Sequence, residues 1–378
     1  MAGIYIHIPF CKQACFYCNF HFTTSLRRKN ELVTALLSEI KLRKDYLNGE
    51  PVETIYFGGG TPSLLQVPDL RSLIEKTFSS FIVDSHVELT IETNPDDIAE
   101  EKLKEWKEAY INRLSIGVQS FFQEDLKWMN RAHTAEQASD NLRSAIRHFN
   151  NITIDLIYGT PLLTNEKWKR NIERAIEFDI SHLSCYALTV EPKTLLYKMI
   201  REKQTPDINA DKQSEQFFLL MQWLEKTGYE HYEISNFAKP GFRSRHNSSY
   251  WQGKKYIGIG PSAHSFDGIT RQWNISNNNI YIDSIEKSII PSEKEILTPT
   301  QQLNEYIMTS LRTIEGLDLN RVGKEAIRHE LRVTSRKFIE RGLMVEEQNH
   351  LKLTPKGKLL ADGIAAELFF EETNKIVQ

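Results

Sequence analysis

Three of the four cysteines of this 378-residue chain, Cys11, Cys15 and Cys18, lie within eight positions and directly follow a short strand-like run. Three thiolates in a C-x3-C-x2-C spacing can hold three irons of a [4Fe–4S] cube, which leaves the fourth iron open to a small molecule. The same residues admit two other interpretations, a zinc knuckle completed by His7 or His21, or three ordinary reduced thiols. The spacing favours the cluster, so the rest of the chain is expected to fold around this loop.

The composition is that of a globular protein, with 40% hydrophobic and 26% charged residues over a length that suits one large and one smaller domain. A net charge of −3 gives no general attraction to polyanions, so no nucleic-acid partner is expected. Three clustered cysteines and a lone Cys185, expected to be a small buried hydrophobe, do not make a disulfide framework.

The compartment follows from the cysteines and the termini. The N-terminal apolar run is short and lacks a basic lead-in, so no signal peptide is expected. No stretch approaches the roughly 18 to 20 apolar residues that span a bilayer, although this leaves peripheral membrane contact open. Because an open-iron cluster is best kept in a reducing compartment, the sequence predicts a cytoplasmic protein.

Strand-like runs alternate with helical patterns in the first half of the chain. Asn30–Leu47, for example, has apolar residues at helical spacing. Such β/α alternation predicts a parallel sheet with helices outside, and six units predict an open (β/α)6 barrel rather than a closed eight. The barrel domain is expected to end near residue 235, after a helix at Asp211–Lys226 and an edge strand at Tyr229–Ile234. The six expected strands are Ile4–Ile8, Val52–Phe57, Val87–Thr93, Arg113–Val118, Ile152–Ile157 and His182–Leu188.

Glycine and polar motifs follow these strands, at the end where barrel proteins gather their reacting groups. Gly58-Gly-Gly-Thr-Pro62 follows the second strand, where glycines let a ligand approach the backbone, although such a run also forms plain tight turns. Glu92, at the end of the third strand, can anchor ribose hydroxyls or an ammonium group, or serve as a helix cap or ion-pair partner. These motifs therefore predict one ligand site at one edge of the sheet.

The cysteine spacing directly after the first strand resembles the radical S-adenosylmethionine (SAM) superfamily. Tyr5-Ile-His-Ile-Pro-Phe-Cys11 and Cys15-Phe-Tyr-Cys18-Asn-Phe are similar to the branch that contains oxygen-independent coproporphyrinogen III oxidases and the HemW-type heme chaperones. The resemblance implies a partial barrel of the radical SAM type and a [4Fe–4S] cluster held by Cys11, Cys15 and Cys18. It further implies that the amino and carboxylate groups of SAM bind the open iron.

The same resemblance assigns contacts with SAM to segments that match the family. Arg131 would pair with the carboxylate of SAM, and the glycine segment would receive its amino group through backbone carbonyls. The residues that the resemblance places against SAM are Tyr5, Gly59, Gly60, Thr61, Glu92, Gln119, Arg131, Asp155 and Ala187.

Beyond the barrel, residues 241–266 are rich in aromatic residues, histidine and glycine, which is typical of a ligand-binding loop. His246-Asn247-x-x-Tyr250-Trp251 resembles the HNxxYW segment that the heme chaperones use for heme, which implies that these four residues contact heme. In many relatives a cysteine stands two positions before this histidine, where this chain has Ser244, so a Cys–His ligand pair is not expected. The alternative is that His246 and Trp251 plug the open edge of the barrel as packed core.

The remaining chain is expected to form the HNxxYW loop segment and a linker over 236–300, in which residues 267–300 are the irregular linker, and a C-terminal domain over 301–378. Helices at Leu303–Leu311 and Glu325–Arg341, two short strands near 343–353 and a helix at Pro355–Phe370 predict a winged-helix-like unit. Its mixed charge favours protein or domain docking over DNA binding.

Three functions fit these features. The first is a heme chaperone that binds heme and, with a SAM-coordinated cluster, delivers it to hemoproteins such as respiratory enzymes, with an electron donor protein as a further partner. The second is a coproporphyrinogen III oxidative decarboxylase, in which SAM is cleaved to a radical that attacks the propionate side chains. The third is a zinc-stabilised docking or DNA-binding protein.

Two sequence features distinguish the heme chaperone from the decarboxylase. The oxidases of this branch carry a further cysteine in a C-x2-C-x-C run and an N-terminal extension that closes over the substrate. Here Cys18 is followed by Asn19-Phe20, and only four residues precede Tyr5. Both differences favour the heme chaperone, for which no catalytic residue is predicted and SAM cleavage is left open.

Overall fold

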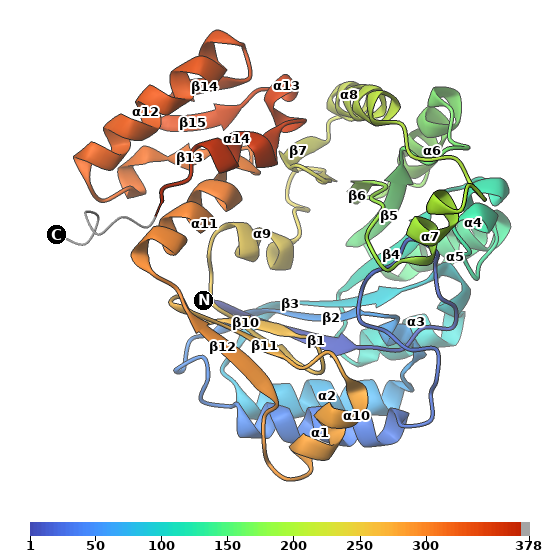
Figure 1. Cartoon of the computed structure of the whole chain (residues 1–378). Coiled ribbons are helices and arrows are strands. Elements are labelled where there is room, and N and C mark those ends of the chain that lie inside the picture. The colour runs from blue at the N-terminus through green and yellow to red at the C-terminus, as the bar shows by residue number, and fades with distance from the viewer. Residues whose placement is uncertain (372–378) are drawn as a thin grey trace.

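The computed structural model describes residues 1–371, and its centre is one open sheet of 12 strands. Six of these strands run parallel in chain order, with helices along their outer face (Figure 1). Buried Ile, Val and Leu side chains fill the layer between the strands and these helices, as parallel sheets require. The six strands are β1 (Ala2–Ile8), β2 (Val52–Gly59), β3 (Val83–Thr93), β4 (Arg113–Gln119), β5 (Ile152–Tyr158) and β6 (His182–Ala187).

The helices that connect these strands lie on the outside of the sheet, because a parallel strand can only be reached by a crossover (Figure 1). Their starts follow local rules: Thr134 and Gln137 form a capping box at one helix, and Thr164 caps the next. The connecting helices are α1 (Lys29–Leu42), η1 (Pro62–Leu64), α2 (Val67–Ser80), η2 (Pro95–Asp97), α3 (Glu100–Glu108), α4 (Gln123–Trp128), α5 (Ala135–His148) and α6 (Asn165–Glu177), and β6 is followed by α7 (Leu195–Arg201) and α8 (Ala210–Lys226). The predicted open barrel is therefore confirmed.

The sheet is extended at both edges and does not close. On one side β9 (Tyr256–Ile259) runs parallel to β1, and β10 (His264–Phe266), β11 (Thr270–Asn274) and β12 (Ser292–Ile296) follow antiparallel. On the other side β8 (Asn236–Ala238) and β7 (Glu230–Glu233) continue from β6. The edge strand predicted at Tyr229–Ile234 is thus confirmed.

The prediction of an irregular linker over 267–300 is wrong, because this segment has regular secondary structure. This segment forms β11, α10 (Asn278–Ile285) and β12 at the edge of the main sheet. The sequence of β12 is Ser-Glu-Lys-Glu-Ile, and its side chains point mostly to solvent because it is an edge strand. Charged residues keep such an edge strand from pairing with other chains. They also replace the hydrophobic alternation from which a strand is predicted, so β12 could not be predicted from that pattern.

A buried carboxylate ties this edge extension to α1. Glu39 is fully buried and accepts hydrogen bonds from Asn274 Nδ2 at 2.7 Å, Tyr281 Oη at 2.6 Å and the backbone N–H of Gly260 at 2.8 Å. Arg43, one turn further along α1, pairs with Glu39 at 3.3 Å and donates to the carbonyl of Gly258. Every oxygen of the carboxylate is therefore satisfied, as a buried charge requires.

The C-terminal domain has its own sheet, in the order β13-β15-β14, and its own hydrophobic core. The helix expected over Pro355–Phe370 is broken into two at residues 359–360, and residues 372–378 of the expected domain lie outside the described residues. The order of helices and hairpin is otherwise the predicted winged-helix-like one. Its elements are α11 (Pro299–Leu311), β13 (Leu317–Asp318), η3 (Leu319–Arg321), α12 (Glu325–Glu340), β14 (Met344–Glu347), β15 (His350–Leu353), α13 (Pro355–Lys358) and α14 (Ala361–Glu367).

One short helix, α9 (Arg245–Trp251), lies between the main sheet and the C-terminal domain (Figure 1). It contains the HNxxYW segment. Within residues 1–371, no helix combines the length and the apolar character that crossing a membrane would require.

Candidate cluster and cofactor site

The cysteine loop leaves the end of β1 and is fixed by backbone hydrogen bonds. The N–H of Cys11 donates to the carbonyl of Thr23 at 3.0 Å, and the N–H of Thr23 donates to the carbonyl of Pro9 at 2.7 Å, so the outgoing and returning segments run side by side. Further along the loop, Asn130 Nδ2 donates to the carbonyl of Ala14 at 2.7 Å. These hydrogen bonds therefore define the shape of the loop.

The three thiols are half-buried and have specific neighbours. Thr61 Oγ1 lies 3.7 Å from the sulfur of Cys11, and Arg131 Nη1 lies 3.3 Å from the sulfur of Cys15. Burial raises the pKa of Cys11 to about 11, with the neighbouring Cys18 and Cys15 adding to the rise. A thiolate here needs a positive partner, which iron supplies when it binds.

The donor set fits an iron–sulfur cube better than a single ion. Over residues 1–371, no three His, Cys, Asp or Glu side chains gather closely enough to hold one metal ion. A cube needs no such convergence, because each thiolate binds a different iron. Cys185, by contrast, is 1% exposed in the core between sheet and helices, which confirms its predicted role as a buried hydrophobe.

The glycine segment at the end of β2 lies directly against the cysteine loop. Gly59 has a φ of +110°, and a Cβ on it would lie 2.4 Å from the His7 ring. A Cβ on Gly60 would lie 2.6 Å from the carbonyl oxygen of Phe10. The predicted glycines are therefore required by close backbone approach, and they leave the strand end free of side chains.

Glu92, at the end of β3, is held by two donors. Tyr56 Oη donates to one carboxylate oxygen at 2.9 Å, and the backbone N–H of Gly59 donates to the other at 3.0 Å. Burial, together with the nearby Asp155, raises the pKa of Glu92 to about 7. Asp155, on β5, has its own pKa raised to about 6 by burial. Two carboxyls that ordinarily ionise near pH 4 thus have pKa values close to neutral pH.

Arg131 reaches the cysteine loop from the turn after α4. Its Nη2 donates to Asn94 Oδ1 at 2.5 Å and to the carbonyl of Gly117 at 2.9 Å, while its buried Nε has no hydrogen-bond partner among residues 1–371. Gln119, the last residue of β4, has a φ of +64°, an uncommon conformation for a residue with a side chain. Backbone strain of this kind is often found at functional sites.

The remaining two residues that were matched to SAM lie on the outer strands of the parallel set. Tyr5, on β1, hydrogen-bonds with His7 Nδ1 at 3.2 Å through its hydroxyl. Ala187 ends β6 and pairs with Tyr158 at the end of β5. The nine predicted SAM contacts thus come from β1 to β6 and the loops that follow them, as predicted for a barrel.

His246, in α9, is buried at 2% exposure and packs inside the open barrel. Its Nδ1 hydrogen-bonds with Thr54 Oγ1 at 2.8 Å and its Nε2 with Tyr250 Oη at 3.0 Å, so both ring nitrogens are engaged. The ring also stacks on Tyr56, with centroids 4.9 Å apart. Burial lowers the pKa of His246 to about 3, and Arg113 contributes, so the imidazole is neutral at physiological pH.

The other residues of the HNxxYW segment face different surroundings. The N–H of Asn247 donates to Ser244 Oγ at 3.2 Å, which caps α9, so Ser244 has a structural role. Trp251 lies under the guanidinium of Arg312 at 5.4 Å, and its buried Nε1 has no hydrogen-bond partner in the described part of the chain. A cleft of about 230 Å³ is lined by Trp251 together with residues of the C-terminal domain, among them Tyr306 and His350.

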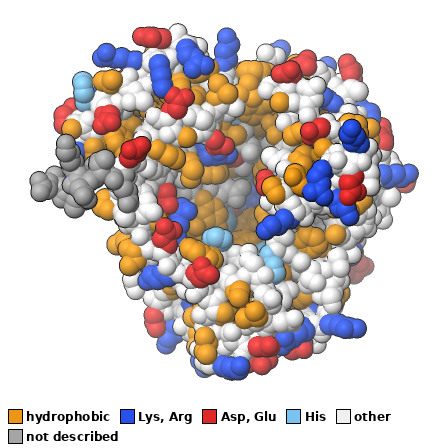
Figure 2. Space-filling model, in the orientation of Figure 1, with side chains coloured by type: hydrophobic (Ala, Val, Ile, Leu, Met, Phe, Trp, Pro, Cys, Tyr) orange, Lys and Arg blue, Asp and Glu red, His pale blue; other side chains and the backbone are white. Residues whose placement is uncertain are grey.

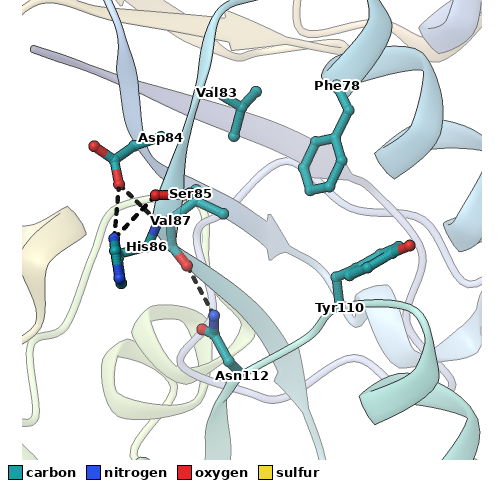
Figure 3. Close-up of a pocket in the computed structure, with 8 residues that line it drawn as sticks. All are labelled: Phe78, Val83, Asp84, Ser85, His86, Val87, Tyr110 and Asn112. Atoms are coloured by element: carbon teal, nitrogen blue, oxygen red, sulfur yellow. Dashed lines mark hydrogen bonds and ion pairs between the residues drawn. The ribbon is translucent and has the colours of Figure 1, made fainter.

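The molecular surface shows the same arrangement. Figure 2 shows a hollow at the centre of this face, between the C-terminal domain and the parallel strands, with hydrophobic and histidine side chains around it. A separate pocket of about 730 Å³, at the start of β3, contains none of the predicted site residues (Figure 3). Its lining residues are Phe78, Val83, Asp84, Ser85, His86, Val87, Tyr110 and Asn112.

Some residues of this site were not predicted. Tyr56 and Thr54 hold Glu92 and His246, and Asn94 accepts the hydrogen bond from Arg131. Strand alternation offered a signal for two of them, because Thr54 and Tyr56 share a face of β2 with Gly58. No local pattern indicates the contact of Asn94 with Arg131, which are far apart in the sequence.

Comparison with known proteins agrees with this geometry. Residues 5–189 match the radical SAM superfamily, and residues 297–360 match the HemN C-terminal domain. The solved structure of coproporphyrinogen III oxidase (HemN) from Escherichia coli, a radical SAM enzyme, has a TM-score of 0.84 at 23% identity, and the match covers 97% of this chain and 90% of that one. At this identity the similarity shows the fold.

Curated relatives match over almost the full length. Heme chaperone HemW of Bacillus subtilis (strain 168) is 33% identical over 372 residues, which cover 96% of this chain and 98% of the relative. Heme chaperone HemW of Escherichia coli (strain K12) is 32% identical in an alignment of 387 positions that covers 98% of each chain. The fold and the cysteine loop thus define a protein of the radical SAM class, a class that implies a [4Fe–4S] cluster and SAM. Within this class, the chain belongs to the HemW family.

Proposed function

We propose that this protein is a heme chaperone, which binds heme and delivers it to target hemoproteins with the help of a SAM-coordinated [4Fe–4S] cluster. The observation that carries the proposal is the position of α9, whose His246 stacks on the tyrosine that holds Glu92. The HNxxYW segment and the cofactor end of the barrel are thereby in direct contact. The HemW relatives, which carry the name heme chaperone, match nearly all of this chain.

Cys11, Cys15 and Cys18 would hold three irons of the cluster, and SAM would bind the fourth. The cluster supplies an electron-transfer centre when it is bound. The carboxylate of Glu92 and the guanidinium of Arg131 offer opposite charges to a ligand that has both an amine and a carboxylate. The SAM contacts that we propose are Tyr5, Gly59, Gly60, Thr61, Glu92, Gln119, Arg131, Asp155 and Ala187.

Heme would bind at α9 through His246, with Asn247, Tyr250 and Trp251 around it. The neutral imidazole is the form that coordinates iron. Since both ring nitrogens are engaged, coordination requires His246 to give up its hydrogen bond to Thr54 or to Tyr250. The Trp251 ring borders the cleft and can offer a flat face to the macrocycle.

We further propose a cytoplasmic protein of three segments. Residues 1–235 would bind the cluster and SAM, residues 236–300 would carry the heme segment, and residues 301–378 would dock the acceptor hemoprotein. A reducing compartment suits the cluster, and a protein that donates electrons to it would be a second partner.

Hemin titration of the anaerobically reconstituted protein tests the proposal. We expect one hemin per chain, with affinity reduced at least tenfold in His246→Ala and unchanged in the control His329→Ala, which alters an exposed histidine of α12. Unchanged hemin binding by His246→Ala would contradict the assignment of His246. Efficient conversion of coproporphyrinogen III in the presence of SAM and a reductant would overturn the chaperone function in favour of an oxidase.

A further inference from the structure

Tyr56 contacts both parts of the proposed site, Glu92 of the SAM site and His246 of the HNxxYW segment. Its hydroxyl donates to Glu92 at 2.9 Å, and the same carboxylate accepts the N–H of Gly59 at 3.0 Å. The position of Glu92 therefore depends on the tyrosine as well as on its own strand. A carboxylate fixed by two donors presents its remaining lone pairs in one direction, which is what recognition of ligand hydroxyls requires.

The ring of the same tyrosine lies on the HNxxYW helix. Tyr56 and His246 stack with centroids 4.9 Å apart and planes inclined by 21°. Tyr5 completes a triangle of rings, 6.1 Å from Tyr56 and 6.4 Å from His246. Because all three rings are packed together, a rotation of the imidazole cannot leave the Tyr56 ring undisturbed.

Helix α9 is attached to the two strands that carry these residues. Glu88, on β3, accepts the N–H groups of Arg245 and His246 at 3.2 and 3.1 Å, and Thr54, on β2, binds the His246 ring. Glu88 lies on the same face of β3 as Glu92, and Thr54 lies on the same face of β2 as Tyr56. Helix α9 therefore contacts β2 and β3 at Thr54 and Glu88, which precede Tyr56 and Glu92 on the same faces of these strands.

We propose that Tyr56 is a positioning residue that couples the heme segment to the SAM site, so that a ligand on His246 weakens the hold of Glu92 on SAM. The proposal rests on the proposed function, because it takes heme and SAM as the two ligands. It deepens that function by giving the protein a means to release one ligand when it takes up the other.

The direction of the coupling follows from the hydrogen bonds. Iron can reach His246 only after Thr54 or Tyr250 has released a ring nitrogen. An imidazole that turns to meet the iron loses its stack on Tyr56, and a Tyr56 ring that moves with it no longer holds its hydroxyl on Glu92. Linkage is reciprocal, so SAM must weaken heme binding by the same factor, which we expect to be about 5- to 10-fold.

Equilibrium dialysis of SAM against the anaerobically reconstituted protein, with and without saturating hemin, measures this coupling. We expect Tyr56→Phe, which keeps the ring and removes the hydroxyl, to bind SAM about tenfold more weakly without hemin. In this variant hemin should change the SAM affinity less than twofold. Tyr110→Phe is the matched control, because Tyr110 is 60% exposed and lies outside the site.

The outcomes separate this proposal from the function on which it rests. A wild-type protein that binds hemin, but whose SAM affinity hemin does not change, would overturn the coupling and leave the chaperone function intact. A hemin effect that persists in full in Tyr56→Phe would overturn the role of Tyr56. Failure of the wild type to bind hemin would overturn the proposed function and the coupling together. The wild type also provides a test without variants, since saturating SAM must weaken hemin binding by the same factor.

Discussion

At the scale of single residues, the contact between β2 and the cysteine loop depends on Gly59. Its φ of +110° is open to glycine and rare for other residues, and an added Cβ would lie 2.4 Å from the ring of His7. We expect Gly59→Ala to lower the free energy of unfolding by on the order of 3 kcal/mol, because backbone strain and the collision with His7 add up. Urea denaturation of the metal-free protein measures this loss.

Gly49→Ala separates these two causes. Gly49 also has a positive φ, +75°, but no heavy atom lies within 4 Å of the point that a Cβ on it would occupy. We expect this variant to lose about 1 kcal/mol, from backbone strain alone. Equal losses for the two variants would show that His7 moves aside freely, and would contradict the tight packing of the glycine segment on the loop.

The residues of the site differ in how far the sequence could predict them. The cysteines and Gly59 lie in short local motifs, so they could be singled out from the sequence. Strand alternation places Tyr56 on the same face as Gly58, but its role could not be predicted, because that role depends on Glu92, 36 positions away, and on His246, which approaches from a different part of the fold. Burial of a polar ring between two such partners is a property of the tertiary structure.

At the scale of elements, α1 and the edge extension β9–β12 are joined by Glu39. The carboxylate is fully buried and has four partners, Arg43, Asn274, Tyr281 and the N–H of Gly260. We expect Glu39→Ala to lower the free energy of unfolding by about 3 to 5 kcal/mol, because it leaves Arg43 as an uncompensated buried charge. Chemical denaturation followed by circular dichroism measures the change.

Glu31→Ala is the matched control on the same helix. Glu31 is exposed in the first turn of α1 and lies 3.9 Å from Arg28, a weak surface pair. We expect its loss to cost less than about 1 kcal/mol. If Glu39→Ala were as mild as Glu31→Ala, the buried network would not be what holds the edge strands to α1.

This network also explains why the edge extension was not predicted. The helices and parallel strands carry hydrophobic periods that can be read directly, and their positions agree with the structure. Residues 267–300 have no such period, because β12 is exposed and α10 is held through the buried Tyr281 and Glu39 pair. Their order depends on a polar partner in α1, more than 200 residues earlier in the chain.

At the scale of the whole molecule, the charges of the C-terminal domain decide between docking to proteins and binding to DNA. The cations of α12 are largely neutralised by neighbouring acids, which leaves little positive field for phosphates. The ion pairs are Arg328 with Glu325, Arg332 with Glu346, and Lys337 with Glu367. A winged-helix-like shape alone therefore does not favour nucleic acid, and we propose that the domain docks a protein partner.

Fluorescence anisotropy with a labelled DNA duplex tests this conclusion. We expect the wild-type protein to bind more weakly than about 100 µM at physiological salt, the weak end of non-specific binding. The variant with Glu325→Gln, Glu346→Gln and Glu367→Gln frees three cations of α12, so it should bind DNA measurably, with an affinity that falls as salt rises. Micromolar binding by the wild type would show that other basic groups form a DNA surface, and would contradict the docking role.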